Sequence, residues 1–154
     1  MTSLIFRALD RHIIDGRADH LAIDDGTFSL TFAQLLAQTA ALAGGLAHVG
    51  VREGMPVFLD VQGAAEVSAV LSLARLGAIP ASATLTQLDT GLRIAGDPPI
   101  VHTGEFDYAW ATILSAGKTD PLPAPELDEP GYEELLLEKY REIFTTLAAG
   151  KTLT

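Results

Sequence analysis

Two Gly-Lys-Thr sequences, at residues 117–119 and 150–152, are the stretches of this chain that most resemble a nucleotide-binding motif. A phosphate-binding P-loop also needs a glycine five positions before that Gly, because its backbone amides must surround the phosphates. Thr112 and Thr145 occupy those positions, and neither sequence follows a predicted strand. We therefore predict that each Gly-Lys-Thr is a helix-terminating glycine with a polar tail, and that neither binds phosphate.

Histidines could act as metal ligands or as acids and bases, but the spacing of the four in this chain does not favour a metal site: they are His12, His20, His48 and His102. His12 lies on a predicted apolar helix face, where a packed histidine is the commoner role. His102 lies near the carboxyl end of a predicted strand, which is the edge where open α/β sheets bind ligands. With Glu105 and Asp107 nearby it could form an acid–base group, although we favour a solvated loop.

Other polar residues give weaker signals. Asp60 also ends a predicted strand, in a position similar to that of His102 at the ligand-binding edge. Its alternative role is to cap the helix that follows. Ser68, Ser72 and Ser115 lack the strand–turn–helix context of a nucleophile elbow. The chain has no cysteine, which excludes disulfides, zinc–thiolate sites and thiol catalysis. The sequence therefore assigns no catalytic, cofactor-binding or metal-binding residue, and it predicts no cofactor.

The elements that would position these residues are clearest between residues 30 and 83, which read as helix, strand, helix and strand. Thr31 can cap the first helix while Gln34 bonds back to it, and Gly50 is placed to end it. The Gly44-Gly45 pair inside this helix costs roughly 1 kcal/mol per glycine relative to alanine. We therefore predict that this pair packs closely against a neighbouring element.

Residues 56–61 are almost wholly apolar, as expected for a strand that is covered on both faces. A helix over 64–76 follows, Gly77 ends it, and residues 78–80 begin the next strand. A strand, a helix and a strand in this order predict a parallel crossover.

The remaining segments have less distinct patterns. Before residue 30 we predict a helix over 3–15, then a hairpin of 20–24 with 27–30 around a two-residue Asp25-Gly26 turn. After residue 83 we predict a loop over 84–90, a short helix over 88–95, a strand over 99–103, a helix over 108–115 and a last helix over 132–147. Between the last two helices lies a proline-rich, acidic stretch, 120–130, typical of a linker or surface loop.

Residues 31–80 resemble the N-terminal region of the adenylate-forming superfamily, which includes acyl-CoA synthetases, nonribosomal peptide adenylation domains and luciferases. Two positions depart from the family pattern: Gly63 replaces a usual Asn, and Arg75-Leu76 stands where the family often has Lys. The residues that match in type and spacing are Thr31, Phe32, Leu35, Ala43, Leu46, Gly50, Val51, Gly54, Val57, Gly77, Ala78, Ile79 and Pro80.

The resemblance also implies what the 154 residues do not contain. The family's phosphate loop, ending in Pro-Lys-Gly, has no counterpart here, and neither do its ribose-binding aspartate, its hinge and its catalytic lysine. The resemblance therefore implies a homologue of the N-terminal part of an AMP-dependent acyl-CoA synthetase or ligase that does not adenylate carboxylates by itself. Two functional classes stay open: a binding or interaction module, and one piece of a split or truncated ligase that needs a second chain carrying the phosphate loop.

Composition narrows the class of protein further. The apolar fraction of 48% predicts a globular chain, and the net charge of −10 argues against nucleic-acid and anionic-membrane partners. No apolar run reaches membrane-spanning length, and residues 1–19 do not form a signal peptide, so we expect a cytoplasmic protein.

We predict an α/β fold with a small, mainly parallel sheet, helices on both faces and an N-terminal β-hairpin. The expected division is an α/β domain over 1–119, a linker over 120–130, and a helix and tail over 131–154. A homodimer, or a protein partner covering an apolar face, is expected as well. The last helix would contribute a stripe of apolar residues to that contact: Leu135, Leu136, Tyr140, Ile143, Phe144 and Leu147.

Overall fold

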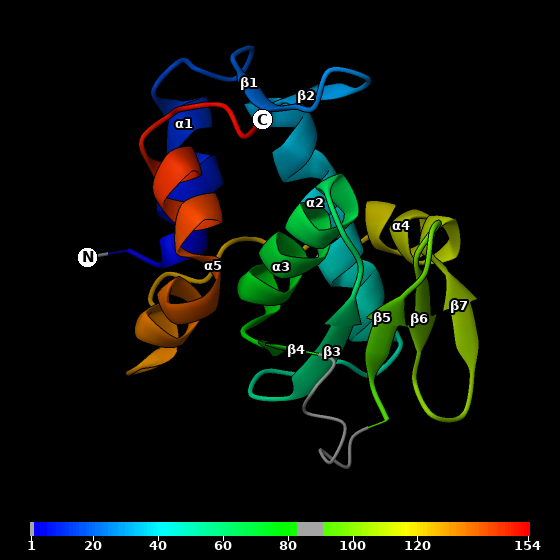
Figure 1. Ribbon diagram of the computed structural model, residues 1–154. Coiled ribbons are helices and arrows are strands. Elements are labelled where there is room, and N and C mark those ends of the chain that lie inside the picture. The colour runs from blue at the N-terminus through cyan, green and yellow to red at the C-terminus, as the bar shows by residue number, and fades with distance from the viewer. Residues whose placement is uncertain (1, 83–90) are drawn as a thin grey trace. The chain divides into compact units, whose positions relative to one another are not determined.

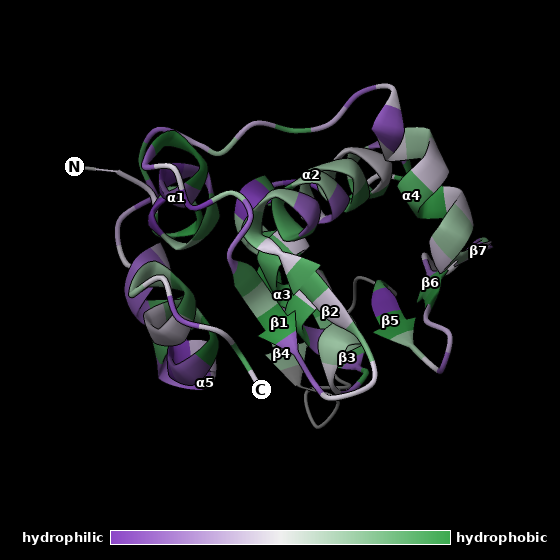
Figure 2. Ribbon diagram, turned by 90° about the horizontal axis from the view of Figure 1, so that it is seen from above, coloured by the Kyte–Doolittle hydropathy of each residue, from purple (hydrophilic) through white to green (hydrophobic). Residues whose placement is uncertain are grey.

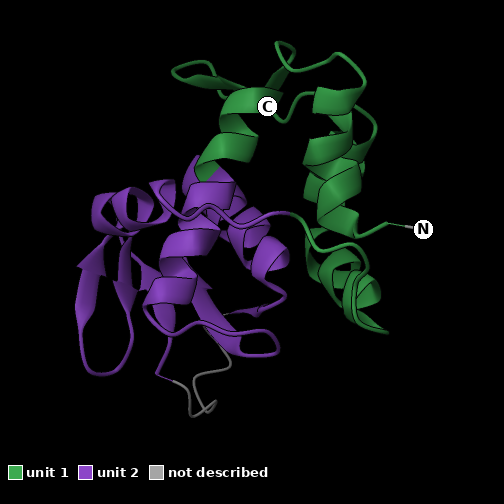
Figure 3. Ribbon diagram, turned by 180° about the vertical axis from the view of Figure 1, so that it is seen from behind, with its two compact units in different colours: residues 1–38, 124–154 green, residues 39–123 purple. Residues whose placement is uncertain are grey.

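The computed structural model describes residues 2–82 and 91–154 (Figure 1). These residues form two compact units, one of residues 1–38 with 124–154 and the other of residues 39–123 (Figure 3). We call them unit 1 and unit 2 and describe each by itself. Together they contain a five-stranded, mixed sheet, a two-stranded antiparallel sheet and several helices, so the predicted α/β class is confirmed.

Unit 1 is built on two helical segments from opposite ends of the chain. The π-helix η1 (Phe6–Asp10) runs directly into α1 (Arg11–Ile14), which confirms the helix predicted over 3–15. The long helix α5 (Tyr132–Ala148) contacts η1 (Figure 1). Figure 2 shows α5 carrying both hydrophobic and hydrophilic residues, as expected for a helix with one buried face. The side chains of Leu136, Phe144 and Leu147 are almost wholly buried.

This burial bears on the expected apolar stripe of the last helix. Within unit 1 the stripe is covered in part by its own chain: Leu136, Phe144 and Leu147 are buried. Leu135, Tyr140 and Ile143 are half-buried. Self-association stays a prediction, and α5 need not be its contact surface.

The predicted hairpin is present in unit 1 as β1 (Leu21–Asp24) paired antiparallel with β2 (Ser29–Thr31). The predicted two-residue turn is wrong, because residues 25–28 form a four-residue loop. The Asp25 carboxylate accepts hydrogen bonds from the backbone amides of Thr27 and Phe28, at 2.9 Å each. These bonds lower the pKa of Asp25, and the bond from the Thr27 amide is the largest cause. They also hold the longer loop.

Helix α2 (Phe32–His48) begins as the sequence predicts. The Thr31 Oγ1 accepts a hydrogen bond from the Gln34 amide at 3.1 Å, and the Gln34 side chain accepts one from the Thr31 amide at 2.9 Å. This reciprocal pair is a capping box. The helix ends before Gly50, whose φ of 105° is in the left-handed region, and the Val51 amide donates to the Leu46 carbonyl at 3.0 Å.

Unit 2 contains the five-stranded sheet, whose strand order is β4-β3-β5-β6-β7. The second strand in this order, β3 (Pro56–Asp60), pairs in parallel with both β4 (Ile79–Ser82) and β5 (Arg93–Ala95). The other pairings, of β5 with β6 (Ile100–His102) and of β6 with β7 (Asp107–Ala109), are antiparallel. Val57, Phe58 and Leu59 are all buried, so both faces of β3 are covered. Between β3 and β4 the chain forms α3 (Ala64–Leu76), which Gly77 ends in the left-handed conformation as predicted.

Two predicted helices are wrong in part. The one expected over 88–95 is contradicted at its end, because Arg93–Ala95 form β5 between two partner strands and Ile94 is fully buried. Residues 91 and 92 are not helical either. Residues 88–90 of that prediction, and the whole loop predicted over 84–90, lie outside the described residues. The helix predicted over 108–115 begins later, as α4 (Trp110–Lys118), because residues 107–109 form the edge strand β7.

The crossing of α2 and α4 in unit 2 depends on three glycines. A Cβ atom on Gly44 would overlap the Asp120 carbonyl oxygen, and one on Gly45 would overlap that of Ile113. A Cβ atom on Gly117 would overlap the carbonyl oxygen of Ala41. The close packing predicted for Gly44-Gly45 is therefore confirmed. Gly117 is the last residue but one of α4 and lacks the positive φ of a glycine that ends a helix, so the predicted helix-terminating role is wrong there.

Candidate functional site

Open α/β sheets bind ligands at the carboxyl edge of their parallel strands, so a site in unit 2 is expected at this edge. Asp60 ends β3 at this edge and is exposed. It does not cap the helix that follows, because Gly63 is the N-cap of α3 and no side-chain hydrogen bond caps this end.

His102 lies at the other end of the strands, where the parallel strands begin. Strand β6 is antiparallel to β5, so the register places His102 beside Arg93, at the amino end of β5, and Ile100 beside Ala95, at the carboxyl end. The expected position at the ligand-binding edge is therefore wrong. The error arose from the direction of β6, which residue spacing alone does not reveal.

The structure does bring His102 and Asp107 together, with 2.7 Å between Nδ1 and Oδ1. They face each other across the β6–β7 hairpin. In the same turn, the Phe106 amide donates to Thr103 Oγ1 at 3.1 Å. The Asp107 side chain is 69% exposed. We interpret the pair as a surface contact that holds the hairpin, in line with the solvated alternative.

Two shallow hollows lie in unit 2 on either side of His48. One, of about 440 Å³, is lined by His48, Val49, Gly50, Thr103, Glu105, Phe106 and Tyr108. The other, of about 380 Å³, is lined by residues that include Arg52, Glu53 and Asp120. The Arg52 guanidinium donates to the Ala47 carbonyl at 2.6 Å and the Val51 carbonyl at 3.0 Å. Its charge therefore stabilises the carboxyl end of α2.

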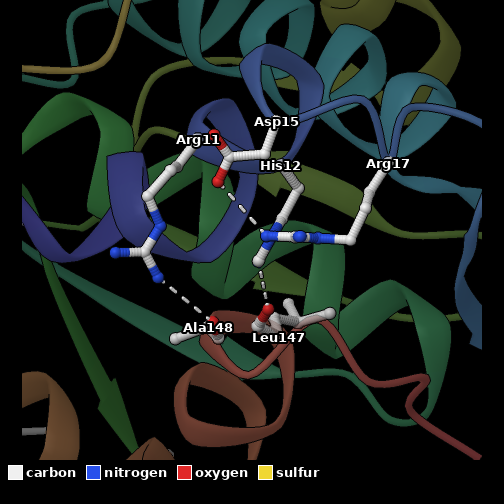
Figure 4. A network of polar contacts seen from close by, with 6 residues as sticks. All are labelled: Arg11, His12, Asp15, Arg17, Leu147 and Ala148. Carbon is white, nitrogen blue, oxygen red and sulfur yellow. Dashed lines mark hydrogen bonds and ion pairs between the residues drawn. The ribbon is translucent and has the colours of Figure 1, made fainter.

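The most complete polar network lies in unit 1, around His12 (Figure 4). The His12 side chain is buried and packs against the Phe32 ring, with 4.7 Å between ring centroids. Its Nε2 is 2.6 Å from the Leu147 carbonyl oxygen, and the Arg17 Nε and NH2 groups are 3.1 and 2.9 Å from its Nδ1. Beside it, Arg11 donates to the Ala148 carbonyl at 3.3 Å.

These contacts assign the protonation state of His12. A guanidinium only donates hydrogen bonds, so Nδ1 must accept, and a carbonyl only accepts, so Nε2 must carry the proton. The ring is therefore neutral. Burial is the main cause that lowers the pKa of His12, and the nearby charges of Arg17 and Arg11 lower it further. The packed role predicted for His12 is confirmed, but its partners on α5 were not predictable from residues so far away in sequence.

Ser72 and Gly150, also considered in the sequence, have structural roles. Ser72 donates to the Ser68 carbonyl at 2.6 Å inside α3. Gly150, with a φ of 75°, follows the end of α5 as predicted. Among residues 2–82 and 91–154, no group of three or more His, Asp or Glu side chains is arranged to hold a metal ion. No helix in the same ranges is long and apolar enough to cross a bilayer.

No family model matches the chain. Malformin synthetase from Aspergillus niger is 31% identical over 118 residues, which are 73% of this chain and 2% of that protein. Feruloyl-CoA synthase from an Amycolatopsis species is 32% identical over 147 residues, 86% of this chain and 30% of that protein. Acetyl-coenzyme A synthetase from Cupriavidus taiwanensis is 39% identical over 79 residues, 47% of this chain and 12% of that protein.

Among solved structures, the N-terminal subdomain of NpsA from Klebsiella oxytoca aligns with 53% of this chain and 21% of that one, at 19% identity and a TM-score of 0.48. The sequence matches confirm the family resemblance: the chain is related to the N-terminal part of the adenylate-forming, or AMP-binding, superfamily of ligases. It spans 2% of the malformin synthetase and less than a third of the feruloyl-CoA synthase.

Proposed function

We propose that these 154 residues act as a non-catalytic binding or interaction module derived from an AMP-forming acyl-activating ligase. The proposal rests on which motifs of such ligases the matched region contains and which it does not. It aligns with a part of such ligases, yet the sequence contains no phosphate loop ending in Pro-Lys-Gly. The two Gly-Lys-Thr sequences lie at the carboxyl ends of α4 and α5. Phosphates bind favourably at the amino ends of helices, where backbone amides are free.

A second candidate is that the module completes a ligase whose phosphate loop is supplied by another polypeptide. The observation that favours it is the extent of the match, which reaches 86% of this chain in feruloyl-CoA synthase. A downstream reading frame that opens with the phosphate loop would favour this candidate, and an unrelated neighbour would favour the independent module.

Pyrophosphate exchange tests the absence of adenylation directly. We expect no carboxylate-dependent exchange by the pure chain with ATP, magnesium and either acetate or ferulate, the acids suggested by the names of two relatives. Exchange that depends on the carboxylate would contradict the proposal.

A chimera separates the two candidates. The matched segment of feruloyl-CoA synthase would be replaced by residues of this chain, with the unchanged synthase as the positive control. Recovered feruloyl-CoA formation would favour the split ligase. A folded chimera without activity, together with a thermal shift of the isolated chain by a small ligand such as CoA or by a partner, would favour the module.

The expected partner is still a protein, either a second copy or another chain. Large apolar side chains remain exposed in both units, among them Ile14 at 73%, Phe106 at 62% and Leu127 at 60%. Light scattering at micromolar concentration tests for the homodimer. A monomer mass would contradict it.

A further inference from the structure

The last residues of the chain form a strap along the edge of β1 in unit 1. We define the C-terminal strap as residues 149–154, which follow α5. The Leu153 amide donates to the Ala22 carbonyl at 2.8 Å, and the Asp24 amide donates to the Leu153 carbonyl at 2.8 Å. The Thr152 hydroxyl also donates to the Leu21 carbonyl at 2.7 Å. The strap therefore pairs with β1 in parallel, and Figure 1 shows the C-terminus beside this strand.

The strap begins where His12 binds the end of α5. His12 bonds to the Leu147 carbonyl, two residues before the strap. Gly150, inside the strap, packs against the same network: a Cβ atom there would lie 3.4 Å from Arg17 Nε and 3.6 Å from His12 Cε1. The path of the strap therefore depends on how His12 and Arg17 are arranged.

A second proton on His12 cannot be accommodated in this arrangement. It would have to bind Nδ1, which already accepts from the Arg17 guanidinium, so two donors would face each other. The charged groups that act on His12 are Arg17, Arg11 and Asp15, and the two arginines outweigh the single carboxylate. From α5 it meets the Leu147 carbonyl, and from α2 the uncharged Phe32 ring.

We propose that the C-terminal strap is a pH-sensitive device, in which protonation of His12 releases the strap from β1. Release frees the Ala22 carbonyl and the Asp24 amide. Exposed backbone groups of this kind let a sheet edge take up an extended segment of another chain. The held strap thus keeps this edge occupied, and acid makes it available.

The direction of the effect follows from linkage. Burial and the charge of Arg17 lower the pKa of His12 below its ordinary value of 6.5 in the held state. Arg17 also lies against Gly150 of the strap, so a released state in which Arg17 leaves Nδ1 binds a proton more readily. Above pH 6.5 both states are neutral at His12 and pH has no effect on release. Below it, the ratio of released to held strap rises by up to tenfold for each pH unit, until the lowered pKa of the held state is reached.

Hydrogen exchange of the 154-residue chain between pH 7.5 and 5.0 tests the proposal. After correction for the intrinsic pH dependence of exchange, the opening equilibrium at the Leu153 and Asp24 amides should rise by up to tenfold per pH unit below 6.5. The Phe58 amide, which donates to Leu92 in unit 2, is an internal control and should not change. His12→Gln removes the titrating ring and should make the opening of the strap independent of pH.

A second variant tests the coupling without altering the His12 network. Leu153→Pro removes the amide that donates to Ala22, so Asp24 should lose its protection at every pH. Because coupling between two sites is reciprocal, the pKa of His12, followed by NMR, should rise towards 6.5 in this variant. Three results would each overturn the proposal. The opening of the strap could be independent of pH in the natural chain, or it could depend on pH equally in His12→Gln. The pKa of His12 could also be unchanged in Leu153→Pro.

Discussion

The two units each bring a pair of helical segments together, but by opposite means. In unit 2, α2 and α4 approach so closely that no side chain fits between them at Gly45 and Gly117. In unit 1, α5 is separated from the N-terminal helical segment by large side chains such as Phe144, and the buried His12 bonds to its last turn. The first contact tolerates no added volume, and the His48–Asp120 ion pair beside it, at 3.5 Å, is exposed to solvent. The second contact loses packed volume when a large side chain such as Phe144 is shortened, and it contains His12, which can take up a proton.

The largest expected effect is on the glycine contact. Gly117→Ala would place a Cβ atom within 3.0 Å of the Ala41 carbonyl oxygen, its carbon and the Gly45 amide nitrogen. Since these are backbone atoms, the helices must separate, and we expect a loss of about 4 kcal/mol or more in the free energy of unfolding. Denaturant unfolding measures it.

The control for this variant is Ala116→Gly, at the exposed neighbouring position of α4. It tests helix propensity alone and should cost about 1 kcal/mol. A Gly117→Ala chain as stable as the natural one would contradict the close approach, because alanine is otherwise the better helix former.

The next effect is the pH dependence of unit 1. Because the pKa of His12 is lowered in the folded chain, its contribution to stability is complete above pH 6.5. It is lost as the pH falls towards the lowered value, at up to about 1.4 kcal/mol per pH unit. Asp128, whose pKa is raised chiefly by burial, acts in the opposite direction in a more acidic range.

The difference between the natural chain and His12→Gln isolates the histidine. Unfolding of both chains at pH 7.5, 6.5 and 5.5 should show a larger acid loss in the natural chain. Parallel curves would mean that His12 is not held neutral. The same experiment on Gly117→Ala should still show the acid loss due to His12, because Gly117 contacts residues of α2 in unit 2 and not the His12 network.

The comparison also shows which parts of the fold the sequence could predict. Helix α3 and the capping box of α2 were predicted correctly because each depends on residues within a few positions of one another. The short strands β5 and β7 were missed because three residues acquire extended structure only from their pairing partners. The bond between His12 and Leu147 joins residues 135 positions apart. The apolar face of the first helix predicted a packed histidine there, but no local pattern could identify its acceptor.

The smallest expected effect is at the start of α2, where neither added volume nor a proton is involved. Thr31→Ala removes the hydroxyl that accepts from the Gln34 amide at 3.1 Å, and we expect it to cost about 1 kcal/mol at any pH between 5.5 and 7.5. Thr31→Ser keeps the hydroxyl and is the matched control. Gln34→Ala removes the reciprocal bond, so the double variant should cost less than the sum of the two single ones, as expected for residues that contact each other. The denaturant midpoints of all four variants, compared at constant slope, measure these losses of stability. Strictly additive losses would mean that the two bonds form independently and that the box is not a cooperative cap. A Thr31→Ala loss as large as that of Gly117→Ala would instead mean that α2 depends more on its first turn than on its glycine crossing.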